Sequence, residues 1–151
     1  MSTRRLSIIA LVLLLSGCVR TADGSDQLTG YWRGYIQIKK GTGGFIDKPT
    51  PLYCKIEQTG NSFIGKYSHA FDADSFKNKI PETNYDLDGT VAGNEIKFRM
   101  SNSSATWLSP DSNAKLRLID DRMNGTWTQI YKNEDGSVKS TYEGVIELVR
   151  Y

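Results

Sequence analysis

Cysteine, histidine and proline are scarce in this sequence, and each scarcity excludes a class of protein. Two cysteines in 151 residues exclude a disulfide scaffold and a cysteine-rich zinc domain. A single histidine excludes a site that needs several imidazoles, and the sequence predicts neither a metal site nor a cofactor. Four prolines without a Gly-X-Y period exclude a collagen-like chain. The whole sequence, with 38% hydrophobic and 11% aromatic residues, has a composition typical of one globular domain.

The sequence also lacks an excess of one charge. Arg4 and Arg5 are the only charged residues before position 18, and they account for the whole formal net charge of +2. A protein that binds nucleic acid usually carries a basic patch or stripe. Because the rest of the chain is balanced, we expect no nucleic-acid partner.

Long hydrophobic runs are absent, apart from a short one near the N-terminus. Ile8 to Leu15 is an unbroken apolar run that would rise only about 12 Å as a helix, against a hydrocarbon core of roughly 30 Å. Two arginines precede the run and small residues follow it. This pattern indicates a secretory signal peptide rather than a transmembrane anchor.

The signal ends in Leu15-Ser16-Gly17-Cys18, which resembles the lipobox of bacterial lipoproteins. The resemblance implies that residues 1–17 are removed and that Cys18 carries a diacylglyceryl thioether, usually with an acyl group on its new amine. Two or three lipid chains anchor a protein durably to a membrane. In lipoproteins of enteric bacteria, an Asp directly after the lipidated Cys retains the protein at the inner membrane. Position 19 is Val in this sequence, so the resemblance implies an anchor in the outer membrane, with the protein facing the periplasm. The alternative is ordinary cleavage and a soluble protein.

Residues 18–27 are polar and small, and they are expected to form a lipidated tether of at most about 30 Å before a domain at 28–151. Lipidation would consume the sulfur of Cys18, which leaves Cys54 without a disulfide partner. In strand alternation Cys54 shares a face with Leu52 and Ile56. We therefore expect a buried and inert thiol at Cys54.

From residue 28 onward, apolar residues recur at every second position, which is the period of β-strands. The alternation and the tight-turn signals between runs predict strands at 29–40, 52–58, 62–69, 85–91, 95–101, 114–119, 125–132 and 137–149. No convincing amphipathic helix is present. Short turns between successive strands favour antiparallel neighbours. The predicted fold is all-β, a small up-and-down barrel of about eight strands, with a β-sandwich as the alternative.

Two connections are long, at 70–84 and 102–113, and both carry bulky apolar residues. Phe76 in the first and Trp107 in the second are candidates for an exposed partner-binding surface. The alternative is that these side chains cap the ends of the barrel.

The residues that could support catalysis are few. His69 would have to serve any imidazole-based reaction, and no nucleophile motif accompanies it. A metal site or a dyad built from His69, Asp72 and Asp74 is conceivable, but a solvated loop explains the same residues. We therefore expect that the protein is not an enzyme.

Aromatic residues on the predicted inward faces offer a different kind of site. Trp32, Tyr67, Trp127 and Tyr142 could line an interior that holds a small ligand. The alternative is a solid core, because an eight-stranded barrel is narrow enough to be filled by its own side chains.

The stretch Gly30-Tyr31-Trp32 resembles the first-strand Gly-x-Trp signature of the lipocalin and avidin superfamilies. In those families the Trp closes one end of the barrel, and Arg150 is a candidate for the basic residue that packs on it in lipocalins. Arg33 stands where avidins carry a biotin-contacting Asn, so biotin binding is not implied. A second lipocalin motif and a C-terminal helix are also missing.

Together these features predict a lipid-anchored protein of the cell envelope that acts as a non-catalytic binding module. Its partners would be the membrane, through the lipid on Cys18, and a small apolar or amphiphilic ligand inside the barrel. The alternative is a module for a protein partner, such as an accessory subunit of an envelope complex, an inhibitor or an immunity lipoprotein.

Overall fold

All eight predicted strands are present in the computed structural model, which describes residues 27–41, 47–69, 72–79, 85–102 and 111–151. The elements are β1 (Gly30–Lys40), β2 (Pro49–Thr59), β3 (Ser62–Ser68), α1 (Ala73–Lys79), β4 (Tyr85–Ala92), β5 (Glu95–Asn102), β6 (Asp111–Ile119), β7 (Arg122–Lys132) and β8 (Val138–Arg150). Strands β2, β6 and β7 each begin three residues earlier than the alternation predicts. Residues 1–26, which include the predicted signal peptide and Cys18, lie outside the described residues, as does Trp107.

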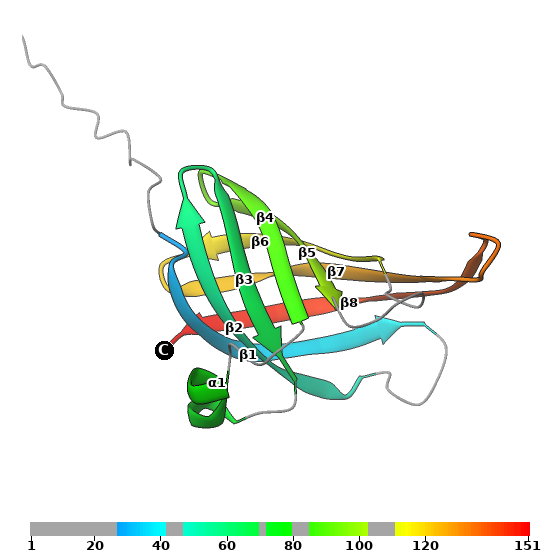
Figure 1. Cartoon of the computed structure of the whole chain (residues 1–151), viewed down its shortest axis with the longest axis horizontal. Helices are drawn as coiled ribbons and strands as arrows, with labels where there is room; N and C mark the ends of the chain where they lie inside the picture. The colour runs from blue at the N-terminus through cyan, green and yellow to red at the C-terminus, as the bar shows by residue number, and fades with distance from the viewer. Residues whose placement is uncertain (1–26, 42–46, 70–71, 80–84, 103–110) are drawn as a thin grey trace, which may run out of the picture.

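The strands form one closed barrel in which each strand pairs antiparallel with the next, and β8 closes the sheet against β1 (Figure 1). This is the predicted up-and-down barrel, and the sandwich alternative is wrong. In the register that closes it, Trp32 of β1 lies between Cys54 of β2 and Arg150 of β8. Closure leaves the sheet without a free edge strand, which is the part of a sheet most prone to unwanted pairing.

Inward-facing glycines allow neighbouring strands to cross closely as the sheet coils. A Cβ at Gly125 would collide with the carbonyl oxygen of Lys115 on the next strand, and one at Gly65 would collide with that of Lys55. Gly89 and Gly144 are placed in the same way. The recurrence of glycine two residues before an apolar or aromatic residue is therefore a requirement of barrel curvature.

One end of the barrel is closed. The two-residue turns at 60–61, 93–94 and 120–121 lie here, together with the start of β1 and the end of β8. Trp32 is fully buried, and its indole N–H donates a hydrogen bond of 2.8 Å to the carbonyl of Leu28. The Arg150 guanidinium lies 4.4 Å above the Trp32 ring. The expectation that Trp32 and Arg150 close one end is therefore confirmed by their contacts.

Arg150 also ties the chain entrance to the closed end. Its guanidinium donates hydrogen bonds to the carbonyls of Thr29, at 2.7 Å, and Gln27, and it pairs with the carboxylate of Asp121 at 2.7 Å. The Gln27 side chain donates to the carbonyl of Gly93 in the β4–β5 turn. The polypeptide thus enters the barrel at its closed end.

At the opposite end, β1, β3, β5 and β7 finish and β2, β4, β6 and β8 begin, because successive strands alternate in direction. We call this end the mouth. Between the two ends, the inward faces of the strands form a continuous buried core, which includes Cys54 between Leu52 and Ile56 as predicted.

A short helix, α1, replaces part of the predicted loop at 70–84. The Asp72 carboxylate accepts hydrogen bonds from the backbone N–H groups of Asp74 and Ser75, which caps the helix and holds the pKa of Asp72 below its usual value. Phe76 is fully buried and lies against Tyr53, with ring centroids 6.0 Å apart. The expectation of an exposed Phe76 is therefore wrong. Within the described residues, no helix is long and apolar enough to cross a membrane.

Candidate ligand site

A cavity of about 170 Å³ opens at the mouth of the barrel. Its lining comes from six of the strands and from the residue that follows β3. These residues are Ile36, Ile38, Thr50, Tyr67, His69, Met100, Ser112, Trp127 and Gln129. At the closed end, Leu28, Trp32 and Met123 are fully buried, as in a solid core, whereas the cavity lies at the mouth.

Two aromatic side chains make up much of the cavity wall. The Trp127 indole N–H donates to the hydroxyl of Ser112 at 2.9 Å, and both residues are buried. Tyr67 is 7% exposed, and its ring contacts those of Tyr85 and His69 at centroid distances of 5.2 and 5.6 Å. The Tyr67 hydroxyl, however, forms no hydrogen bond with any residue that the structure describes. Buried tyrosine hydroxyls usually have a partner, so this group requires an explanation.

His69 stands at the rim and is held in one tautomer. Its Nδ1 lies 2.7 Å from the carbonyl oxygen of Pro51. Because a carbonyl can only accept, Nδ1 must carry the hydrogen, and Nε2 of the neutral ring is an acceptor. Partial shielding of the ring from water lowers the pKa of His69, and the bond to Pro51 opposes this shift. The rim histidine is therefore neutral at and above neutral pH.

Among the described residues that line the cavity, none is Lys, Arg, Asp or Glu. Its polar atoms belong to neutral groups, among them the Gln129 amide, which is half-buried, and the hydroxyl of Thr50 at the rim. Among the described residues, the Gln129 amide has no hydrogen-bond partner. The site is thus a largely apolar hollow with a few uncharged polar groups, which is the usual make-up of a small-molecule site.

The structure brings together two of the four predicted ligand-binding residues, Tyr67 and Trp127. Trp32 lies at the closed end, fully buried, and does not line this cavity. Tyr142 lies beside the cavity, packed edge-on against Tyr131 at 5.7 Å, and does not line it either. All four residues lie on the inward face of their strands, as predicted. Strand alternation does not, however, show how far along the barrel axis a residue lies.

Two lining residues, Thr50 and Ser112, were not predicted from the sequence. Both precede the predicted starts of their strands, at 52 and 114, and both belong to strands that begin earlier in the structure. Extending the alternation backwards would have placed Thr50 on the face of Leu52, and Ser112 on the face of Ala114. The two prolines at 49 and 51 obscured the first of these signals.

The residues suggested for catalysis or metal binding are used otherwise. The Asp72 carboxylate caps α1, and Nδ1 of His69 bonds to backbone. Among the described residues, no group of three His, Cys, Asp or Glu side chains is placed to hold a metal ion. Cys54 is buried, and desolvation raises the pKa of its thiol, which keeps it protonated and unreactive.

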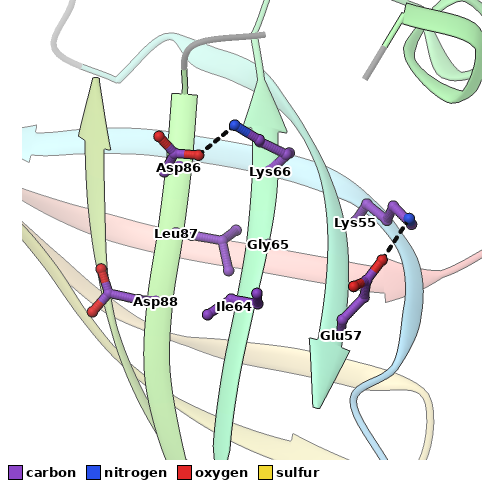
Figure 2. Close-up of a pocket in the computed structure, with 8 residues that line it drawn as sticks. All are labelled: Lys55, Glu57, Ile64, Gly65, Lys66, Asp86, Leu87 and Asp88. Atoms are coloured by element: carbon purple, nitrogen blue, oxygen red, sulfur yellow. Dashed lines mark hydrogen bonds and ion pairs between the residues drawn. The ribbon is translucent and has the colours of Figure 1, made fainter. Parts of the chain in front are cut away.

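A second hollow, of about 530 Å³, lies on the outer wall over β2, β3 and β4 (Figure 2). Ile64, at its centre, is 65% exposed. Two ion pairs flank it, Lys66 with Asp86 at 2.5 Å and Lys55 with Glu57 at 2.6 Å. This outer groove is larger than the mouth cavity, but its charged side chains are already in ion pairs, Asp88 with Arg99 beside the groove, and it is open to solvent.

Comparison of the chain with protein-family models, with curated proteins and with solved structures finds no match. The assignment of a function therefore depends on the chain's own residues and their geometry. The barrel itself and the contact between Trp32 and Arg150 are observed, whereas the lipobox remains a resemblance.

Proposed function

We propose that this chain is a lipid-anchored protein of the bacterial cell envelope whose barrel binds a small molecule at its mouth without catalysis. The observation that carries the proposal is the cavity of about 170 Å³ between Tyr67 and Trp127. A cavity of roughly 150 Å³ lined by apolar side chains is known to hold one benzene molecule. The mouth therefore has room for one ring or for the end of a short chain, and a longer amphiphile would insert only its tip.

The position of the chain entrance supports an orientation for the anchored protein. Gln27 and Thr29 are bound at the closed end, and the tether from Cys18 to Gln27 spans at most about 30 Å. A lipid on Cys18 would hold the closed end nearer the membrane and leave the mouth toward the aqueous compartment. In a Gram-negative bacterium this would be the periplasm, with the anchor in the outer membrane. The ligand would then arrive from the aqueous side.

The ligand function can be tested by filling the cavity from its rim. Thr50→Trp places a large ring over the mouth without changing the buried core, because Thr50 is exposed. Thr90→Trp is a matched control, since Thr90 is exposed on the outer wall. In titration calorimetry with small neutral aromatic compounds, we expect saturable binding by the wild type and the control, and none by Thr50→Trp. Equal binding by both variants, or no binding at all, would contradict the proposal.

The second candidate function is a module that binds a protein partner. Its binding surface would be the outer groove, not the two long connections suggested by the sequence. Ile64 is an exposed aliphatic side chain between two ion pairs. Its partner would be a protein segment with an apolar side chain flanked by charges of both signs. A photo-crosslinking residue at position 64 should then give one defined adduct in the native host. A crosslinker at Ile119, which is 56% exposed near the closed end, is the control.

A further inference from the structure

We propose that the ligand of the mouth cavity is an uncharged, ring-sized molecule with a hydrogen-bond acceptor, and that the hydroxyl of Tyr67 donates to that acceptor. This inference rests on the proposed ligand function and adds the chemical class of the ligand and the residue that selects it. Three independent features of the cavity support it: an unpartnered donor, the absence of charge, and the size.

The unpartnered donor is the clearest of the three. The Tyr67 side chain is more than nine-tenths buried, lines the cavity, and forms no hydrogen bond with any described residue. Leaving a buried hydroxyl without a partner is unfavourable, so such groups are usually satisfied by protein, water or ligand. Burial also raises the pKa of Tyr67 well above its ordinary value. The hydroxyl therefore stays protonated, and a ligand acceptor would satisfy it.

The neutral lining disfavours ionic ligands in the same space. A carboxylate or ammonium group that entered would lose its hydration, and the lining residues that the structure describes offer no opposite charge to replace it. The polar atoms that do face the cavity, on Gln129, Thr50 and His69, can bond only to neutral groups without a large desolvation cost. The cavity volume of about 170 Å³ then limits the inserted part to about one ring with a small substituent.

The test compares three single-ring probes with the same number of heavy atoms: acetophenone, which is neutral with an acceptor; cumene, which is neutral without one; and benzoate, which is an anion. Binding is measured by titration calorimetry to the full chain in lipid nanodiscs, with empty nanodiscs as the blank for partition into lipid. The variant is Tyr67→Phe, which keeps the ring and removes the hydroxyl. Tyr85→Phe is the matched control, because Tyr85 contacts Tyr67 but is 40% exposed and does not line the cavity.

We expect the wild type and Tyr85→Phe to bind acetophenone most tightly and benzoate most weakly. Tyr67→Phe should weaken acetophenone binding about fivefold, which is the worth of one buried hydrogen bond, and leave cumene unchanged. Cumene binding as tightly as acetophenone, benzoate binding best, or no change in Tyr67→Phe would overturn the inference but leave the ligand function standing. No saturable binding of any probe would overturn both.

A stability measurement tests the alternative that the Tyr67 hydroxyl already has a hydrogen-bond partner in the free protein, for example a trapped water. If the hydroxyl has no partner in the free protein, the urea midpoint of Tyr67→Phe should equal or exceed that of the wild type. A midpoint below the wild type, with Tyr85→Phe unchanged, would show that the hydroxyl already has a partner, and it would overturn the inference.

Discussion

At the scale of single residues, Arg150 has the largest set of contacts at the closed end. It bonds two carbonyls of the chain entrance, pairs with Asp121, and covers the Trp32 ring. Charged hydrogen bonds and cation–π contacts of this kind each contribute on the order of 1–3 kcal/mol when partly buried. The pair with Asp121 contributes less, because the Asp121 side chain is 72% exposed.

We therefore expect Arg150→Ala to lower the free energy of unfolding by about 2–3 kcal/mol in urea titrations followed by tryptophan fluorescence. Asp121→Ala removes only the exposed ion pair and should lower it by less than about 1 kcal/mol. Equal losses in the two variants would show that the surface pair, and not the contact with Trp32 and the entrance carbonyls, accounts for the stability.

His69 gives a prediction for pH dependence. Its pKa is lower in the folded protein than in the unfolded chain, so the unfolded chain takes up the proton first as pH falls. Stability should therefore decrease as pH falls through about 6.5, and this contribution should level off below the folded pKa. The urea midpoint should drop more between about pH 8 and about pH 5 in the wild type than in His69→Gln. A larger drop in the variant would contradict the direction of the shift.

Residue faces were largely predictable from sequence, whereas residue depth was not. Alternation placed Cys54 inside with its neighbours because the side-chain period of a strand is fixed at two. It could not tell that Trp32 closes one end while Trp127 lines a cavity at the other, because depth depends on the stagger between strands. Stagger is set by pairing across the sheet, which one sequence does not display.

At the scale of elements, α1 depends on two contacts that sequence periodicity could not reveal. The helix has seven residues, which is too short to be stable alone or to show a helical pattern. The Asp72 cap and the buried ring of Phe76 hold it on the outer wall, where Lys77 lies 4.6 Å from the ring centre of Tyr151. Phe76 stands out in the sequence as a bulky apolar residue in a polar segment, but it is buried and not exposed as predicted.

Phe76→Ala should therefore release α1 without unfolding the barrel, because Phe76 lies outside the main core cluster. Amide hydrogen exchange at 73–79 should become much faster, with exchange in the strands nearly unchanged. Asp72→Ala should act in the same direction with a smaller effect, at about 1 kcal/mol for one helix cap. A cooperative loss of protection throughout the barrel in Phe76→Ala would contradict this separation.

Glycines at close contacts between strands should tolerate substitution much less well than glycines in open turns. Gly125→Ala would bring a Cβ into the carbonyl oxygen of Lys115, and neither strand can move away without disturbing its own pairing. We expect this variant to be strongly destabilised or not to fold. Gly60→Asn, in a turn with open space around it and a positive φ that Asn tolerates, should change the thermal midpoint only slightly. Similar midpoints in both variants would contradict the packing explanation for the recurring glycines.

At the scale of the whole molecule, the anchor and the barrel can be tested separately. If Cys18 is lipidated, the mature protein has one unmodified thiol, that of Cys54, and it is buried. A thiol reagent should then label the native protein very little and label it once after unfolding. Cys18→Ser should move the protein from the membrane fraction to the soluble fraction. Rapid labelling of the native, membrane-bound protein would contradict lipidation at Cys18.

The fold class was predictable because composition, alternation and turn spacing all indicate the same architecture. Of the four residues predicted to bind a ligand, only Tyr67 and Trp127 line the cavity. Strand count and short turns lead to a closed barrel, but whether a barrel of this size is filled depends on the volumes of side chains at one level of the interior. Here the buried closed end and the cavity at the mouth are built from the same strands. Only the three-dimensional register separates them.

The most direct test of the central claim is native mass spectrometry of the mature protein, isolated gently from its own host, beside Thr50→Trp and Thr90→Trp. A ligand-binding mouth predicts a small retained mass on the wild type and on Thr90→Trp that is absent from Thr50→Trp. A bare mass for all three, together with no binding of added neutral aromatic compounds, would contradict the claim and direct attention to the outer groove around Ile64.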